Sequence, residues 1–132
     1  MNILLDTHTF LWFVWDDAQL SQTAKDTITD PNNRKLVSMA SVWEIAIKVS
    51  LQKLDLGMPY LSFMQSQLAI NLFEILPMRL DHGAEVSRLP FHHRDPFDRL
   101  MIAQAMWEQI PIVSADPAFD AYSISRRSTH IQ

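Results

Sequence analysis

Four acidic residues each stand beside an apolar stretch that is typical of a buried strand or of the helix next to one. They are Asp6, Glu44, Asp98 and Asp116, here called the four acids. In an open parallel sheet the carboxyl ends of the strands lie along one edge, so carboxylates placed there can converge in one crevice. The pattern therefore predicts a cluster of carboxylates at this edge of a sheet.

Such a cluster requires compensation of its charge. Two carboxylates about 4 Å apart repel by roughly 4 kcal/mol at an effective dielectric near 20, so the four acids need shared protons or a counter-cation. The chain has no Cys, and ligation by oxygen alone favours Mg2+ or Mn2+ over zinc. These ions clamp phosphate oxygens and orient water, which is the chemistry of phosphoryl transfer.

Each of the four acids also has a purely structural explanation. Asp6 could cap the helix that follows it, and Asp116 could open a turn. Glu44 could complete a capping box with Ser41, or pair with Lys48 four residues later. Singly, no acid is decisive. As a set they are harder to explain as caps, because independent caps need not share one edge of the sheet.

Asp98 has a neighbouring rival in Asp95. Asp95 fits the N-cap position, because Pro96 follows it at the favoured first position of a helix. Asp98 then stands in the first turn, where any acid gains from the helix dipole.

The elements that would position these residues alternate between strands and helices. Strands are expected at residues 2–5, 36–39, 72–76 and 112–115, with a fifth near 130–132. Helices are expected at residues 7–15, 21–29, 60–69, 82–89 and 96–109, and after a cap at Ser41. This order predicts an α/β fold with a parallel sheet.

Length and composition narrow the function classes. The 132 residues fit a single domain, residues 1–132, with a core large enough to need no disulfides. A net charge of -4 argues against a protein that coats phosphates, but not against an enzyme that meets phosphate through divalent cations. No apolar run approaches the roughly 20 residues that span a bilayer, and no basic leader precedes the first strand. We expect a cytoplasmic protein with no membrane partner.

Four segments, spread across nearly the whole chain, together resemble one known family. They are residues 3–12, 41–48, 93–105 and 112–119. The chain resembles the PIN-domain ribonucleases, and in particular the VapC-like toxins of bacterial toxin–antitoxin pairs. Each segment is a weak match alone, but the set follows the family order. The resemblance implies a three-layer α/β/α fold with a central parallel sheet of four to five strands.

The resemblance also implies roles for individual residues. Asp6, Glu44, Asp98 and Asp116 would be the metal-binding and catalytic acids, with Asp98 rather than Asp95 in third place because the family's acid stands just before a Leu-x-Ile-Ala segment. Thr7 and Ser114 resemble the small polar residues that flank this site and orient water or a carboxylate.

The activity that the resemblance implies is hydrolysis of RNA phosphodiester bonds by a Mg2+- or Mn2+-dependent endoribonuclease. The products would carry 5′-phosphate and 3′-hydroxyl ends. The protein would be a homodimeric toxin, silenced by a small cognate antitoxin, and would meet operator DNA only through the antitoxin complex. Three basic residues could contact RNA phosphates, although a solvated loop or pairing with another acid explains them equally well. They are His93, Arg94 and Arg99.

An apolar surface for the antitoxin is expected on two segments. Residues 9–15 and 60–69 offer more apolar side chains than a small domain can hide under its own sheet, and exposed patches of this kind mark binding sites. An amphipathic antitoxin helix could lie in the groove between them and contact Trp12, Trp15 and Phe63.

Two other α/β classes place an Asp at the end of a first strand. A phosphatase or phosphotransferase of the haloacid dehalogenase type expects a second Asp two residues after Asp6, where this chain has His8. A receiver-like interaction domain expects paired acids near the first strand and a Lys after the last, and neither is present at those positions. The nuclease is therefore the favoured hypothesis.

Overall fold

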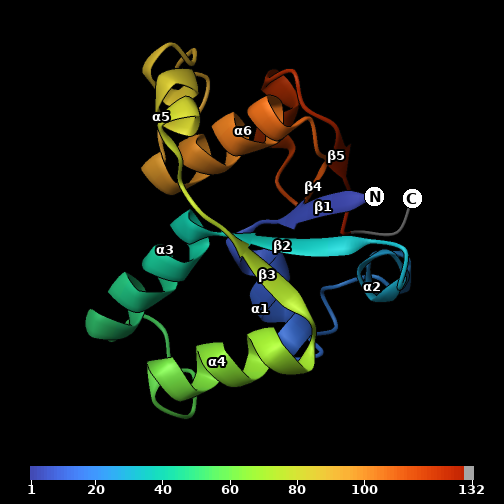
Figure 1. Ribbon diagram of the computed structural model, residues 1–132. Coiled ribbons are helices and arrows are strands. Elements are labelled where there is room, and N and C mark those ends of the chain that lie inside the picture. Colours follow the sequence, from blue (N-terminus) through green and yellow to red (C-terminus); the bar gives the residue numbers. More distant parts are fainter. Residues whose placement is uncertain (130–132) are drawn as a thin grey trace.

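The computed structural model describes residues 1–129 and contains one parallel sheet (Figure 1). Its strands are β1 (Asn2–Leu5), β2 (Arg34–Ser38), β3 (Phe73–Leu76), β4 (Ile112–Val113) and β5 (Arg126–Arg127). They lie in the order β3-β2-β1-β4-β5, and every neighbouring pair is parallel. The chain thus builds outward from β1 first to one side and then to the other. The crevice at the carboxyl ends of β1 and β4, where the order reverses, is the usual ligand site of such sheets.

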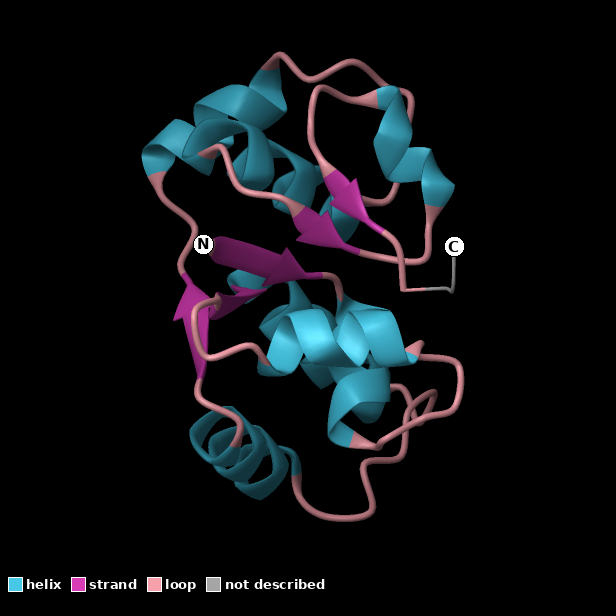
Figure 2. Ribbon diagram, turned by 90° about the vertical axis from the view of Figure 1, so that its right-hand side faces the viewer, coloured by secondary structure: helices cyan, strands magenta, loops and turns pink. Residues whose placement is uncertain are grey.

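Helices cover both faces of the sheet, which gives the three-layer arrangement expected from the resemblance (Figure 2). They are α1 (Thr7–Val14), α2 (Gln22–Thr29), α3 (Met39–Ser50), α4 (Tyr60–Ile70), α5 (Leu80–Ser87), α6 (Pro96–Glu108) and the short 3-10 helix η1 (Pro117–Ala121). Helices α5 and α6 lie on one face, and α1, α2 and α4 on the other. No helix in residues 1–129 is long and apolar enough to cross a membrane.

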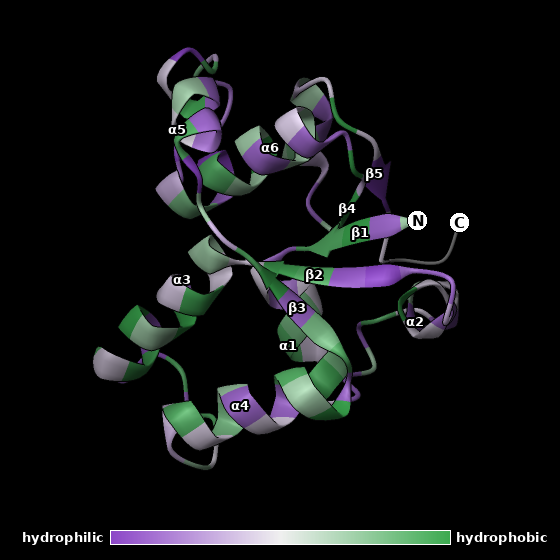
Figure 3. Ribbon diagram, viewed as in Figure 1, coloured by the Kyte–Doolittle hydropathy of each residue, from purple (hydrophilic) through white to green (hydrophobic). Residues whose placement is uncertain are grey.

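The central strand supplies both hydrophobic cores. Ile3 and Leu5 point into the core that contains Phe10 of α1, whereas Leu4 points into the core that contains Met101 of α6. All five side chains are fully buried, and each contributes about 1.5–3 kcal/mol of transfer free energy. Figure 3 shows the result, because both β1 and β2 turn from hydrophilic at their starts to hydrophobic further along. The sheet is therefore driest where the acids follow it.

The start of α3 differs from the expectation. The helix begins at Met39 with Ser38 as its N-cap, whose hydroxyl accepts the Ala40 N–H at 2.9 Å. The capping box predicted for Ser41 and Glu44 is therefore wrong. Ser38 both ends β2 and caps α3, so no loop lies between the strand and the helix. Ser41 and Glu44 therefore lie inside the helix, and both are buried.

The last strand also differs in position. The fifth strand predicted near residues 130–132 lies outside the described residues. The strand that pairs with β4 is instead β5, in the register Ile112 to Arg126 and Val113 to Arg127. β5 consists of two arginines and no apolar residue. The apolar pattern by which a buried strand is identified from sequence is therefore missing.

Candidate active site

Asp6 ends β1 and serves as the N-cap of α1. Its Oδ1 accepts the Thr9 N–H at 2.9 Å, and its Oδ2 accepts the Ser114 hydroxyl at 2.5 Å. Ser114 directly follows β4, so this bond joins the two central strands at their carboxyl ends. Burial raises the pKa of Asp6, and the hydrogen bonds from Ser114 and Thr9 oppose that rise. The carboxylate is both a helix cap and a fixed acid at the sheet edge.

Glu44 reaches the same edge from α3. Its Oε1 accepts the Thr7 hydroxyl at 2.6 Å, and the Thr7 and Ser41 hydroxyls lie 2.8 Å apart. Its Oε2 pairs with Lys48 at 2.9 Å, as the structural explanation had proposed. Thr7 is the first residue of α1, so the small polar residue predicted beside the site does hold one of the four acids. It ties α3 to the end of β1.

Asp98 is placed by the start of α6. The Asp95 side chain caps this helix by accepting the N–H groups of Phe97 and Asp98 at 2.9 and 3.0 Å, and Pro96 occupies the first turn. The cap predicted for Asp95 is thus confirmed. The Asp98 side chain stands in the first turn of α6 and takes no part in capping the helix.

The charges of the surrounding acids act on Asp98. Burial, followed by the charges of Asp95, Asp6, Glu44 and Asp116, raises the pKa of Asp98 to about 7. The other three of the four acids are therefore all close enough to disfavour its ionised form. The group of candidate ligand atoms that lie within 4.8 Å of one another contains Asp98 and Asp116 but not Asp6 or Glu44, so the convergence of all four acids on one cation stays a prediction.

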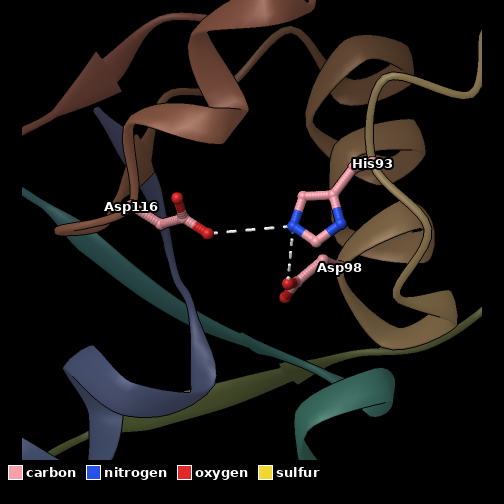
Figure 4. Close-up of side chains that lie close together, drawn as sticks. All are labelled: His93, Asp98 and Asp116. Atoms are coloured by element: carbon pink, nitrogen blue, oxygen red, sulfur yellow. Dashed lines mark ion pairs between the residues drawn. The ribbon is translucent and has the colours of Figure 1, made fainter.

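His93 lies between two of the four acids (Figure 4). Its Nε2 is 3.0 Å from Asp98 Oδ2 and 3.7 Å from Asp116 Oδ2. Each of the three residues offers one ligand atom, and these atoms lie within 4.8 Å of one another. Asp116 also caps η1, because its Oδ1 accepts the Ala118 N–H at 2.9 Å. The sequence had suggested His93 only as an RNA contact, although its position two residues before a helix cap could have indicated a ring that folds back.

The two arginines suggested for RNA contact differ from each other. Arg94 is exposed and makes no ion pair in the described part of the chain. Arg99 is buried and stacks over Phe91 at 3.9 Å. Its guanidinium donates to the carbonyls of Val86, Leu89, Pro90 and His93. Arg99 therefore holds the loop before α6, and this role replaces the suggested RNA contact.

The donor set suits a hard divalent cation. The four acids present carboxylate oxygens near the carboxyl end of the sheet, and burial, followed by the charges of the neighbouring acids, raises the pKa of Asp98. Oxygen donors of this kind match Mg2+ and Mn2+. Ser114 and Thr7 fix Asp6 and Glu44 by hydrogen bonds, which is how carboxylate ligands are oriented in metal sites.

Comparison with known families settles the fold. The model of the PIN domain family matches residues 3–124. This chain belongs to the PIN domain family. PIN domains are generally nucleases, so the family and the acid cluster indicate the same class of chemistry. A comparison with curated proteins found no significant match.

Solved structures share the fold over the whole chain. VapBC2 from Rickettsia felis, bound to a DNA fragment from its promoter, matches with a TM-score of 0.74 at 18% identity, covering 98% of this chain and 100% of that one. VapBC-1 from nontypeable Haemophilus influenzae gives 0.71 at 11%, covering 97% and 98%. A toxin–antitoxin complex from Klebsiella pneumoniae gives 0.64 at 13%, covering 98% and 99%. At these identities the likeness shows the fold alone.

The raised pKa of Asp98 predicts how stability depends on pH in the metal-free PIN domain. The folded pKa of about 7 exceeds the ordinary value of 3.8, so the stabilisation is complete below pH 3.8 and is lost as pH rises through 7. Between pH 5 and pH 8 we expect the free energy of unfolding to fall by about 2–3 kcal/mol more in the parent than in Asp98→Asn. Urea unfolding in a chelator measures it. Equal pH slopes in the parent and the variant would contradict the prediction, and Asp81→Asn, at an exposed acid, is the control.

The placement of Arg99 predicts a second effect on stability. Arg99→Met leaves the loop carbonyls without donors, and we expect it to cost about 2–4 kcal/mol in urea unfolding. Arg94→Met, at an exposed side chain, should cost less than about 0.5 kcal/mol. Similar costs for the two variants would show that the guanidinium does not hold the loop.

Proposed function

We propose that this PIN domain is a Mg2+- or Mn2+-dependent endoribonuclease of the cytoplasm that hydrolyses RNA phosphodiester bonds. The observation that carries the proposal is the gathering of acids at the carboxyl edge of the sheet, in a family that is generally nucleolytic. Asp98 and Asp116 offer oxygens within 4.8 Å of each other, and the Ser114 hydroxyl contacts both the Asp6 carboxylate and the Asp116 N–H. Carboxylates that repel one another in a dry crevice favour a bound divalent cation over the empty state.

The residues of the site would have two roles, metal binding and the orientation of the metal ligands. Asp6, Glu44, Asp98 and Asp116 would hold the cation. Ser114 and Thr7 would keep Asp6 and Glu44 in place through the hydrogen bonds already formed. The metal, when bound, clamps phosphate oxygens, orients the attacking water and stabilises the developing charge. The side chains contribute the positions of the carboxylates.

The rival enzyme and the receiver-like domain fit less well. His8 occupies the place of the second Asp of a haloacid dehalogenase, and its side chain is exposed. The PIN family match over residues 3–124 supports the nuclease over both rivals. Neither rival explains why Glu44, on a helix, faces the same edge.

We further infer that the protein is the toxin of a toxin–antitoxin pair. The matched solved structures include VapBC and toxin–antitoxin complexes, and two of them, from Rickettsia felis and Salmonella typhimurium, contain DNA. By this likeness the chain would form a homodimer, bind a cognate antitoxin, and reach operator DNA through that complex.

The groove expected between residues 9–15 and 60–69 is partly filled by its own side chains. Phe63 is 2% exposed, and Trp15 packs against it at 6.4 Å between ring centres, so α1 and α4 close on each other. An open apolar pocket of about 400 Å3 lies along α3 instead. It is lined by Met39, Ala40, Val42, Trp43, Ala46, Tyr60, Met78 and Leu100. We propose this pocket as the seat of an apolar face of the antitoxin.

The nuclease proposal predicts metal-dependent cleavage of RNA. We expect a chelator to abolish cleavage and excess Mg2+ or Mn2+ to restore it. Charge-removing variants should lower the rate by about 100-fold or more, the scale on which single electrostatic groups act. They are Asp6→Asn, Glu44→Gln, Asp98→Asn and Asp116→Asn. Mapping of cut sites in total cellular RNA measures the effect.

Asp95→Asn is the matched control for these variants. Asn caps a helix about as well as Asp, so α6 should begin at the same residue and cleavage should stay within a few-fold of the parent. Full activity in a chelator would refute the metal proposal. Loss of activity in Asp95→Asn but not in Asp98→Asn would place the third ligand at Asp95.

The proposed role of the α3 pocket predicts which substitutions weaken antitoxin binding. Trp43→Ala and Met78→Ala should each weaken the complex with the small protein encoded beside this chain by about 10-fold or more, because an exposed Trp in an apolar pocket is a typical hot spot. Ile70→Ala, 72% exposed but outside the pocket, should leave the Kd unchanged. Calorimetric titration measures the Kd. Equal effects of Trp43→Ala and Ile70→Ala would exclude the pocket.

A further inference from the structure

His93 is held more firmly than a loop histidine that only meets solvent. Its backbone N–H donates to the Tyr122 hydroxyl at 2.8 Å, and its carbonyl accepts from Arg99 at 3.2 Å. Its ring lies 6.0 Å from the Phe119 ring, and its side chain is only 16% exposed. The main chain and the ring are thus both fixed, with Nε2 directed at Asp98 and Asp116 (Figure 4).

The other ring nitrogen determines which atom carries the proton. His93 Nδ1 accepts the backbone N–H of Asp95 at 3.2 Å. A backbone N–H is always a donor, so the nitrogen that faces it must offer a lone pair and carries no hydrogen. The ring hydrogen of the neutral imidazole therefore resides on Nε2, which lies 3.0 Å from Asp98 Oδ2.

This tautomer is the opposite of the one that a metal ligand needs. A histidine that binds a cation through Nε2 gives up the hydrogen there and carries it on Nδ1. In this protein a hydrogen on Nδ1 would face the hydrogen of the Asp95 N–H. Two donors would then oppose each other, and the present hydrogen bond would be lost. The hydrogen bond from the Asp95 N–H to Nδ1 consequently opposes metal ligation by His93 Nε2, although Nε2 lies close to Asp98 and Asp116.

We propose that His93 is a positioning residue that donates a permanent hydrogen bond to Asp98 and is not itself a metal ligand. This inference rests on the metal site of the proposed function. Asp98 Oδ2 is engaged by the imidazole, while Oδ1 accepts no hydrogen bond from residues 1–129 and remains available to a cation. The cation would then meet oxygen atoms only, in keeping with Mg2+ or Mn2+.

The same ring separates two acids that come from different elements. Asp98 belongs to α6 and Asp116 caps η1, and no hydrogen bond joins their side chains in the described residues. The Nε2–H lies between their oxygens, where it opposes their mutual repulsion. Removing the donor should let the two carboxylates move apart and should weaken their joint hold on a cation.

Two substitutions separate the two ring nitrogens. The amide nitrogen of Gln can take the place of Nε2 and still donate to Asp98. The shorter Asn reaches only the place of Nδ1, where its oxygen can accept the Asp95 N–H but no donor reaches Asp98. The test therefore compares His93→Gln with His93→Asn, and uses His92→Asn, at the exposed neighbouring histidine, as the control.

Mn2+ affinity is the first measurement, made by electron paramagnetic resonance of free Mn2+ on the whole chain. We expect His93→Gln and His92→Asn to bind as the parent does. His93→Asn should bind about 10-fold more weakly or worse, which is the usual cost of losing a hydrogen bond to a metal ligand. Thermal unfolding of the three variants checks that they fold. Parent-like affinity in His93→Asn would overturn the positioning role.

The coordination itself is the second measurement. Pulsed electron paramagnetic resonance of bound Mn2+ detects a directly coordinated imidazole nitrogen, and labelling His with nitrogen-15 identifies the signal. We expect no directly bound nitrogen in the parent. Such a signal, lost in His93→Gln, would overturn the inference and make His93 a ligand while the nuclease proposal survived. If the parent bound no Mn2+, the proposed function itself would fail.

Discussion

The mutual repulsion of carboxylates at the end of β1 and β4 is the constraint on which the rest of this PIN domain depends. Burial and neighbouring acids raise the pKa of Asp98 to about 7, so the crevice is electrostatically unfavourable in its metal-free state. The structure opposes that cost with individual donors, a hydroxyl for Asp6, a hydroxyl and an ammonium group for Glu44, and an imidazole for Asp98. Thr7 of α1 and Ser114 after β4 act across elements, whereas Lys48 stands on the same helix as Glu44.

Two buried polar networks hold those layers in register. Gln104 of α6 accepts the Ser38 hydroxyl at 2.5 Å and donates to the Pro77 carbonyl at 3.3 Å, which joins the helix to the carboxyl ends of β2 and β3. Arg99 and Tyr122 hold the loop before α6 through its carbonyls and the His93 N–H. Unpaired, these groups would each cost about 1–3 kcal/mol. These contacts thus help to fix the position of α6, and with it the position of Asp98.

The sequence predicted the parallel α/β order and the edge that holds the acids, because apolar runs closed by an acid are local signals. It did not predict that Ser38 rather than Ser41 caps α3, since both hydroxyls stand near the strand end and only the turn geometry decides between them. The burial of Arg99 was also missed. A guanidinium that collects carbonyls from its own preceding loop resembles a surface arginine until the chain is folded.

Capping and the proposed chemistry use the same carboxylates, which is why the structural and functional explanations of the acids need not compete. Asp6 caps α1 through Oδ1, and Asp116 caps η1 through Oδ1. In each case a helix start fixes the carboxylate, and its N-terminal dipole partly offsets the negative charge. An N-cap spends one lone pair of one oxygen, and a carboxylate has about four. The remaining acceptor sites stay available at the sheet edge, so a capped acid is rigid and keeps most of its coordinating capacity. Asn caps as well as Asp but carries no charge, and for that reason substitution at Asp6 can separate the folding role of the residue from its role at the metal.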